Sequence, residues 1–93
     1  MQEEFRTFVR VTLSDAFAQV LRGHRLKAGL SQEELGFEAQ LHPGTISLFE
    51  RGLRCPSLNT VFLLARAMNI PPELMVAEIA AMYPRAGVVD GST

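Results

Sequence analysis

Residues 31–52, SQEELGFEAQLHPGTISLFERG, decide the fold of this chain. Ser31 is a favourable helix N-cap, and Glu34 three residues later completes a capping box of the Ser-x-x-Glu type. The pattern predicts a first short helix that ends near Ala39. Residues 40–42 then form a tight connection with an apolar residue at its centre, so a second element must begin almost at once.

That second element is also predicted to be a short helix. His42 can cap it, Pro43 suits its first turn because no N–H is needed there, and Gly52 is a natural terminator. Ile46 and Phe49 are three residues apart and face inward. Two helices of about nine residues joined by so short a turn must cross steeply, which lets the second protrude into a DNA major groove. On this pattern alone, an all-α bundle without a nucleic-acid role is the alternative.

The residues around the motif carry a resemblance to a known family. They are LSQEEL at 30–35, TIS followed by ERG within 45–52, and PSL at 56–58. Together they resemble the XRE family of helix-turn-helix regulators, which includes the lambdoid phage repressors, restriction-modification controller proteins and many antitoxins. The resemblance covers roughly residues 16–80. It implies an all-α, five-helix, lambda-repressor-like DNA-binding domain, but not which regulator this is.

Composition agrees with one small domain. The chain has 93 residues, 47% of them hydrophobic, which is enough for a single core. No apolar run approaches the roughly 18 residues of a membrane span, and the N-terminus lacks the apolar stretch of a signal peptide. Cys55 is the only cysteine, which excludes an intrachain disulfide and suits a reduced compartment. We therefore expect a cytoplasmic protein without a metal or cofactor.

The chain divides into an N-terminal extension (1–13), the DNA-binding domain (14–83) and a flexible tail (84–93). Within the extension, apolar residues alternate over 9–13 as in a half-buried strand, whereas Phe5 and Phe8 suit a helical face. The family does not require this segment. It could pack on its own domain, pair with a partner chain or lengthen the first helix.

Three further helices are predicted around the motif. A second capping box, Thr12-x-x-Asp15, starts one of them near residue 13 or 14, and Gly29 ends it. The last two are predicted for about 57–69 and 71–83, each opened by proline or serine.

The resemblance also implies a buried ion pair. Arg25 matches the first-helix arginine that, in phage repressors, pairs with a glutamate at the end of the recognition helix, and that glutamate is Glu50 here. Glu50 directly follows the inward Phe49, and a buried carboxylate without a cation is costly. We expect both residues to set the angle of the recognition helix rather than to contact DNA.

The same resemblance indicates which side chains would contact DNA. Gln32, at the start of the first motif helix, would contact a phosphate, as would Arg54 beyond the second. The second helix would present these residues outward: His42, Pro43, Gly44, Thr45, Ser47 and Leu48.

Several of the outward positions depart from better-known relatives. Pro43, Gly44 and Leu48 stand where Gln, Arg or Asn are common, and they cannot form the bidentate base pairs that contribute roughly 1–3 kcal/mol of discrimination each. Direct readout would then rest on Thr45, whose methyl can meet that of thymine, and on three further residues, namely Ser47, His42 and Arg51. Readout of DNA shape would have to supply the rest.

A formal net charge of −1 is low for a DNA-binding protein, because phosphate attraction normally demands a basic face. Several cations nevertheless lie early in the domain, whereas acidic residues lie near the C-terminus: Arg22, Arg25, Lys27, Arg51 and Arg54 against Glu73, Glu78 and Asp90. We interpret this as a modestly positive DNA face, with a mixed solvated surface as the alternative. Weak binding by a monomer would then require a dimer.

The last predicted helix is apolar around much of its circumference, which predicts a second surface to bury and hence a homodimer. The residues assigned to this interface are Leu74, Met75, Ile79 and Met82. An ordinary core helix is the alternative.

The leading function is a dimeric, sequence-specific transcriptional regulator of double-stranded DNA, either activator or repressor. An antitoxin-like interaction module is the second hypothesis. An enzyme is not expected, because the sequence contains no clustered nucleophile and base. A small-molecule ligand is not expected either.

Overall fold

The computed structural model describes residues 11–83, and in that range the chain is all-α. The helices are α1 (Leu13–Lys27), α2 (Gln32–Ala39), α3 (Pro43–Glu50), α4 (Leu58–Ala67) and α5 (Pro72–Met82). The predicted five-helix fold is confirmed. None of these helices is long and apolar enough to cross a membrane. The expectations for 1–10 and 84–93 lie outside the described residues.

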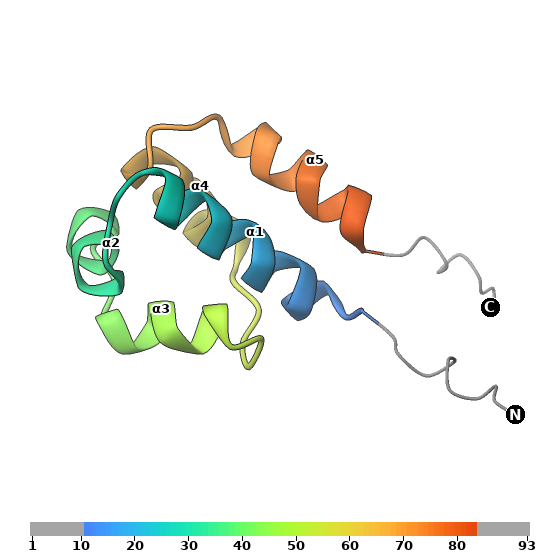
Figure 1. The fold of residues 1–93 in the computed structure, drawn as a ribbon, viewed down its shortest axis with the longest axis horizontal. Coiled ribbons are helices and arrows are strands. Elements are labelled where there is room, and N and C mark those ends of the chain that lie inside the picture. The colour runs from blue at the N-terminus through green and yellow to red at the C-terminus, as the bar shows by residue number, and fades with distance from the viewer. Residues whose placement is uncertain (1–10, 84–93) are drawn as a thin grey trace, which may run out of the picture.

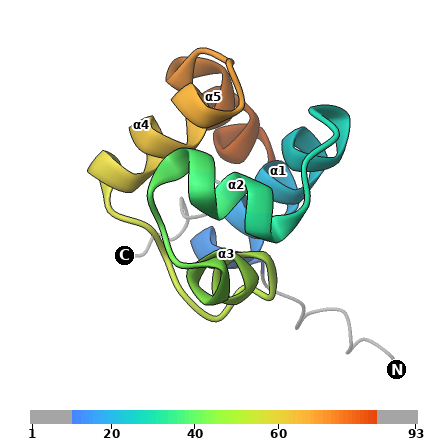
Figure 2. The ribbon, with the colours of Figure 1, turned by 90° about the vertical axis from the view of Figure 1, so that its left-hand side faces the viewer.

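Helix α1 is central to the arrangement (Figure 1). It packs against α3 and against α5, while α2 packs against α3 and α4, and α4 against α5. Helix α3 lies along one edge of the molecule in both ribbon views (Figures 1 and 2). Its inner side meets α1 and α2, and its opposite side is free of the other described helices. One helix of the motif is therefore left available to a partner.

Side chains start four of the helices as the sequence predicts. Thr12 and Ser31 accept hydrogen bonds from the backbone N–H groups three residues later, at 3.0 and 2.9 Å. The carboxylates of Asp15 and Glu34 accept in return from the N–H groups of Thr12 and Ser31, so both predicted capping boxes are present. Ser57 caps α4 in the same way without a box, and His42 caps α3.

The first four helices end in the same backbone motif. In each, one residue adopts a left-handed conformation, and the residue after it donates its N–H to the carbonyl five positions earlier. The left-handed residues are Gly29, Gln40, Gly52 and Asn69. The two glycines were predicted as terminators. Gln40 was not, since a long side chain rarely adopts this conformation.

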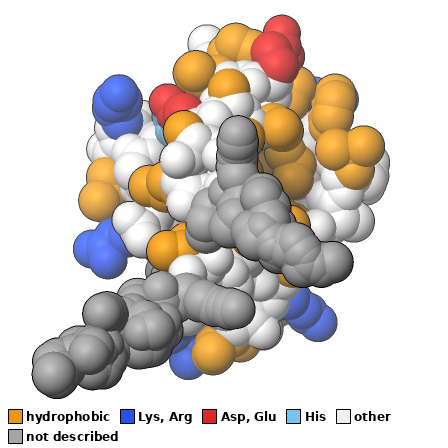
Figure 3. Space-filling view, turned by 90° about the vertical axis from the view of Figure 1, so that its right-hand side faces the viewer, with side chains coloured by type: hydrophobic (Ala, Val, Ile, Leu, Met, Phe, Trp, Pro, Cys, Tyr) orange, Lys and Arg blue, Asp and Glu red, His pale blue; other side chains and the backbone are white. Residues whose placement is uncertain are grey.

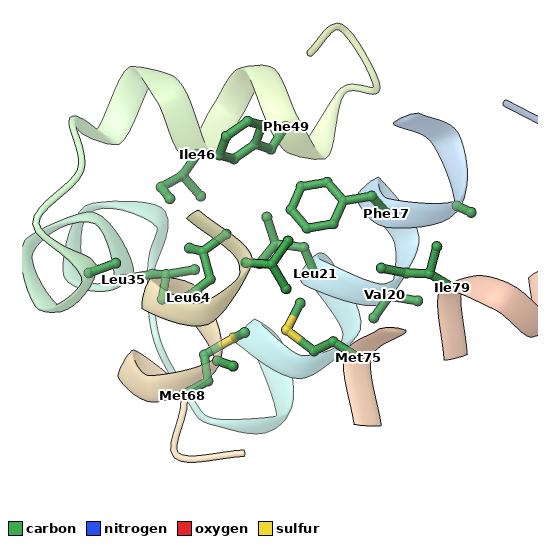
Figure 4. Packing of buried hydrophobic residues seen from close by; sticks show 14 residues of the cluster. Phe17, Val20, Leu21, Leu35, Ile46, Phe49, Leu64, Met68, Met75 and Ile79 are labelled. Atoms are coloured by element: carbon green, nitrogen blue, oxygen red, sulfur yellow. The ribbon is translucent and has the colours of Figure 1, made fainter. Parts of the chain in front are cut away.

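The core lies between α1 and the other helices (Figure 4). Phe17 of α1 and Phe49 of α3 meet edge to face, with ring centroids 5.3 Å apart. This aromatic contact seats α3 on α1, and such pairs add about 0.5–1.5 kcal/mol beyond their buried area.

One part of the predicted dimer interface is wrong. Met75 and Ile79 are four residues apart on the side of α5 that packs into the domain, and they are 0% and 8% exposed. Both fill the core of their own chain, and only Ile79 also reaches the wall of a surface groove. Leu74 and Met82 are exposed, so only these two of the four assigned residues are accessible.

Candidate nucleic-acid interface

The turn between α2 and α3 depends on a glycine inside α2. A Cβ added to Gly36 would lie 2.7 Å from the carbonyl oxygen of Leu41 and 3.3 Å from backbone atoms of Pro43. The backbone N–H of Leu41 donates to the Gly36 carbonyl at 2.7 Å, which closes the turn. The two helices of the motif therefore approach backbone to backbone, a role for Gly36 that the sequence pattern did not predict.

The structure brings Arg25 and Glu50 together at the far end of α3. The Arg25 Nε and Nη2 groups donate to the two carboxylate oxygens at 2.6 and 2.9 Å, in a bidentate pair. The side chains are only 10% and 5% exposed. Arg25 Nη1 also donates to the carbonyl of Leu30, so the guanidinium is held at both ends. The hydrogen bond to Glu50, and then its charge, raise the pKa of Arg25 above its ordinary value despite the burial.

Gln32 joins this pair. Its Nε2 amide donates to Glu50 Oε1 at 3.1 Å, so Glu50 links α1, the first residue of α2 and the last residue of α3. The side chain is half-buried and points along the motif rather than freely into solvent. One amide N–H remains for another acceptor, which leaves the predicted phosphate contact of Gln32 as a prediction.

The outer side of α3 carries little hydrogen-bonding chemistry. The His42 ring accepts the Gly44 N–H at its Nδ1 atom, 2.9 Å, so the proton of the neutral ring lies on Nε2. Gly44 is exposed and has no side chain. The rest of this side is partly exposed: Pro43, Thr45, Ser47 and Leu48.

Two exposed arginines lie at and beyond the C-terminal end of α3. Arg51 turns back along the helix, where its Nε donates to Ser47 Oγ at 3.2 Å. Arg54 is exposed in the loop that leads to α4. Because Arg25 neutralises the adjacent Glu50, the charge at this end of α3 is positive. Among residues 11–83 no group of three metal-binding side chains lies close together.

The steep pair of short helices, the buried arginine–glutamate pair and the free outer side of α3 agree with the comparisons. A family model described as helix-turn-helix matches residues 21–75. This chain belongs to the XRE-type helix-turn-helix family. It is therefore a DNA-binding regulator of the kind found in that family, and the resemblance read from the sequence is confirmed.

This helix-turn-helix protein is similar to three named regulators. The control protein C.BamHI of Bacillus amyloliquefaciens is 41% identical over 58 residues, which are 61% of this chain and 72% of that protein. The restriction-modification controller protein C.AhdI from Aeromonas hydrophila is 40% identical, with a TM-score of 0.63 over 64% of this chain and 91% of that one. The clp gene regulator ClgR from Corynebacterium glutamicum is 25% identical, with a TM-score of 0.72 over 77% of this chain and 94% of that one.

Proposed function

We propose that this helix-turn-helix protein is a controller-type transcriptional regulator that binds a pseudo-palindromic operator as a homodimer. The observation that supports it best is the linkage of Arg25, Glu50 and Gln32, which fixes the C-terminal end of α3 to α1 and α2 while the outer side of α3 stays free. A helix so held can enter a major groove without ordering itself first. C.BamHI and C.AhdI are named as controllers, so a restriction-modification locus is the first regulatory context to test. Its compartment would be the cytoplasm.

The contacts would divide into positioning and reading. Gln32 and Arg54 would hold phosphates on either side of α3, because one lies at a helix N-terminus and the other is an exposed cation. Residues of α3 would meet base edges. Arg51, whose Nη groups are not used by Ser47, would reach the edge of the half-site.

An apolar groove provides the surface for the dimer. It has a volume of about 220 Å³ and lies between α1, the loop before α4, the start of α4, and α5. Its lining residues are Leu13, Phe17, Cys55, Pro56, Leu58, Val61, Val76 and Ile79. Leu13, Leu58 and Val76 form its exposed rim, at 44%, 68% and 47% exposure. Hydrophobic side chains gather on the end of the molecule where α1 begins and α5 ends (Figure 3). A two-fold dimer across this groove replaces the interface first placed on α5 alone.

Selection of bound duplexes from a random DNA pool, together with sedimentation of the protein and its complex, tests this function. We expect enrichment of an inverted repeat whose half-sites are about one helical turn apart, roughly 34 Å, and a complex with two protein chains. A pool without any enriched sequence would contradict DNA recognition. A monomer bound to a single site would contradict the dimer alone.

A further inference from the structure

We infer that α3 selects its operator through the 5-methyl groups of thymine, contacted by Thr45 and Leu48, and not through bidentate hydrogen bonds to purines. This inference rests on the proposed function, because it requires that α3 enters the major groove. It makes Leu48 a specificity-determining residue, although its side chain cannot form hydrogen bonds to base edges.

The inward and outward sides of α3 are defined by the burial of its side chains. Ile46 and Phe49 are buried at 0% and 3% exposure and define the inner side of the helix. At 100° per residue, Gly44 and Leu48 fall near the opposite side, one turn apart. Thr45 lies three residues before Leu48 on the adjoining flank and is also partly exposed. The part of α3 that can enter a groove is therefore formed by Gly44 and Leu48, with Thr45 on one flank and Ser47 on the other.

The polar groups nearby each make one hydrogen bond within the protein. His42 accepts from the Gly44 N–H through Nδ1, an interaction that ties its ring to the first turn of α3. A Cβ added to Gly44 would lie 3.0 Å from that ring nitrogen, so the ring occupies the space beside the glycine. Ser47 Oγ accepts from Arg51 Nε, which draws the hydroxyl toward the C-terminal end of the helix. No Asn, Gln, Lys or Arg occurs within α3, and Arg51 is its C-cap, six residues after Thr45.

The chemistry of the major groove supplies the matching ligand. Thymine presents a methyl group there, and it is the only base of unmodified DNA that does so. Because Gly44 has no side chain, the backbone of α3 can come closer to the base edges than a helix with a long residue at that position. Close approach brings short apolar groups, namely the Thr45 methyl and the Leu48 side chain, into contact with methyl groups at the floor of the groove.

Replacement of thymine by uracil tests this directly, since it removes only the methyl group. On the operator selected above, each thymine is changed in turn to deoxyuridine, and binding of the full chain is titrated. We expect about a fourfold loss of affinity at one or two positions per half-site, which corresponds to the ~0.8 kcal/mol of one buried methyl group. Selected half-sites without thymine, or an operator bound equally well with uracil throughout, would overturn the inference while DNA recognition stands.

Protein variants assign the contact. Thr45→Val keeps a methyl group and should keep the preference for thymine over uracil, whereas Thr45→Ser keeps the hydroxyl and should lose it at one position. Leu48→Ala should abolish the preference at another position. Leu74→Ala, on α5 and across α1 from α3 (Figure 1), is the matched control and should change nothing. Loss of the preference in Thr45→Val with retention in Thr45→Ser would show hydroxyl readout and overturn the inference. A random pool that yields no operator would overturn the proposed function and this inference together.

Discussion

The Glu50 carboxylate accepts three hydrogen bonds, two from Arg25 and one from Gln32. Each of its partners belongs to a different helix, so this one side chain couples the position of α3 to the rest of the domain. The raised pKa of Arg25 means that the guanidinium loses its proton only at still higher pH. The contribution of Arg25 to stability is therefore fully present across the neutral range, with no pH dependence of its own there.

Removal of either partner leaves a buried charge without a counterion. We expect Arg25→Ala and Glu50→Ala each to lower the free energy of unfolding by about 3–5 kcal/mol, and the double variant to cost less than the sum. Gln32→Ala is the milder control and should cost about 1–2 kcal/mol, because only one hydrogen bond to Glu50 is lost. Thermal and urea denaturation provide the measurement. Melting temperatures of the two single variants within a degree of the wild type would contradict the structural role of the pair.

Unlike the buried and paired Arg25, Arg54 is exposed and makes no described ion pair. If it neutralises one phosphate, Arg54→Ala should weaken binding to every sequence and make the slope of log affinity against log salt shallower by about 0.9 per monomer. Arg66→Ala is the matched control, since Arg66 is an exposed arginine in the last turn of α4 and should leave the slope unchanged. Equal slopes for wild type and Arg54→Ala over a range of salt would remove Arg54 from the phosphate contacts.

At the scale of the elements, two glycines inside helices have opposite surroundings. A Cβ on Gly36 would meet the Leu41 carbonyl at 2.7 Å, whereas a Cβ on Gly23 in α1 would meet nothing within 4 Å. We expect Gly36→Ala to destabilise the fold by about 1–3 kcal/mol, because the backbone of the turn cannot move aside cheaply. Gly23→Ala should instead stabilise α1 by about 0.5–1 kcal/mol. Urea denaturation of both variants measures the difference, and the same sign for both would contradict the close approach of α2 and α3.

The contrast between these glycines also shows which features of the fold cannot be predicted from sequence patterns. Helix starts were predictable because capping depends on residues within three positions, as with Ser31 and Glu34. The left-handed Gln40 was not, because its conformation is imposed by the packing of α2 on α3 against the preference of the residue. The hydrogen bond from Gln32 to Glu50 could not be predicted from the sequence either, because those residues are 18 positions apart and meet only when the motif is folded.

At the scale of the whole molecule, the apolar circumference of α5 explains why its interface residues were misassigned. Periodicity shows that more than one side of the helix is apolar, but not which side faces the core. In the structure, Met75 and Ile79 face inward, whereas Val76 lies on the rim of the apolar groove and Leu74 lies outside it. The described chain thus offers a surface groove in which hydrophobic residues of α1, the loop before α4, α4 and α5 come together.

Single charges introduced on α5 test whether the apolar groove is the dimer interface. Val76→Glu should keep the helical circular dichroism of the wild type and raise the dissociation constant of the dimer by at least about 100-fold, because two carboxylates would be desolvated across the two-fold interface. Ile79→Glu, at 8% exposure, should instead unfold the chain, since the charge would enter the core. Leu74→Glu is the exposed control outside the groove and should change neither property. Sedimentation equilibrium with circular dichroism separates the three outcomes. If Val76→Glu dimerises like the wild type while Leu74→Glu becomes monomeric, the two chains meet across the other side of α5, and the spacing of the two α3 helices must be derived from that surface instead.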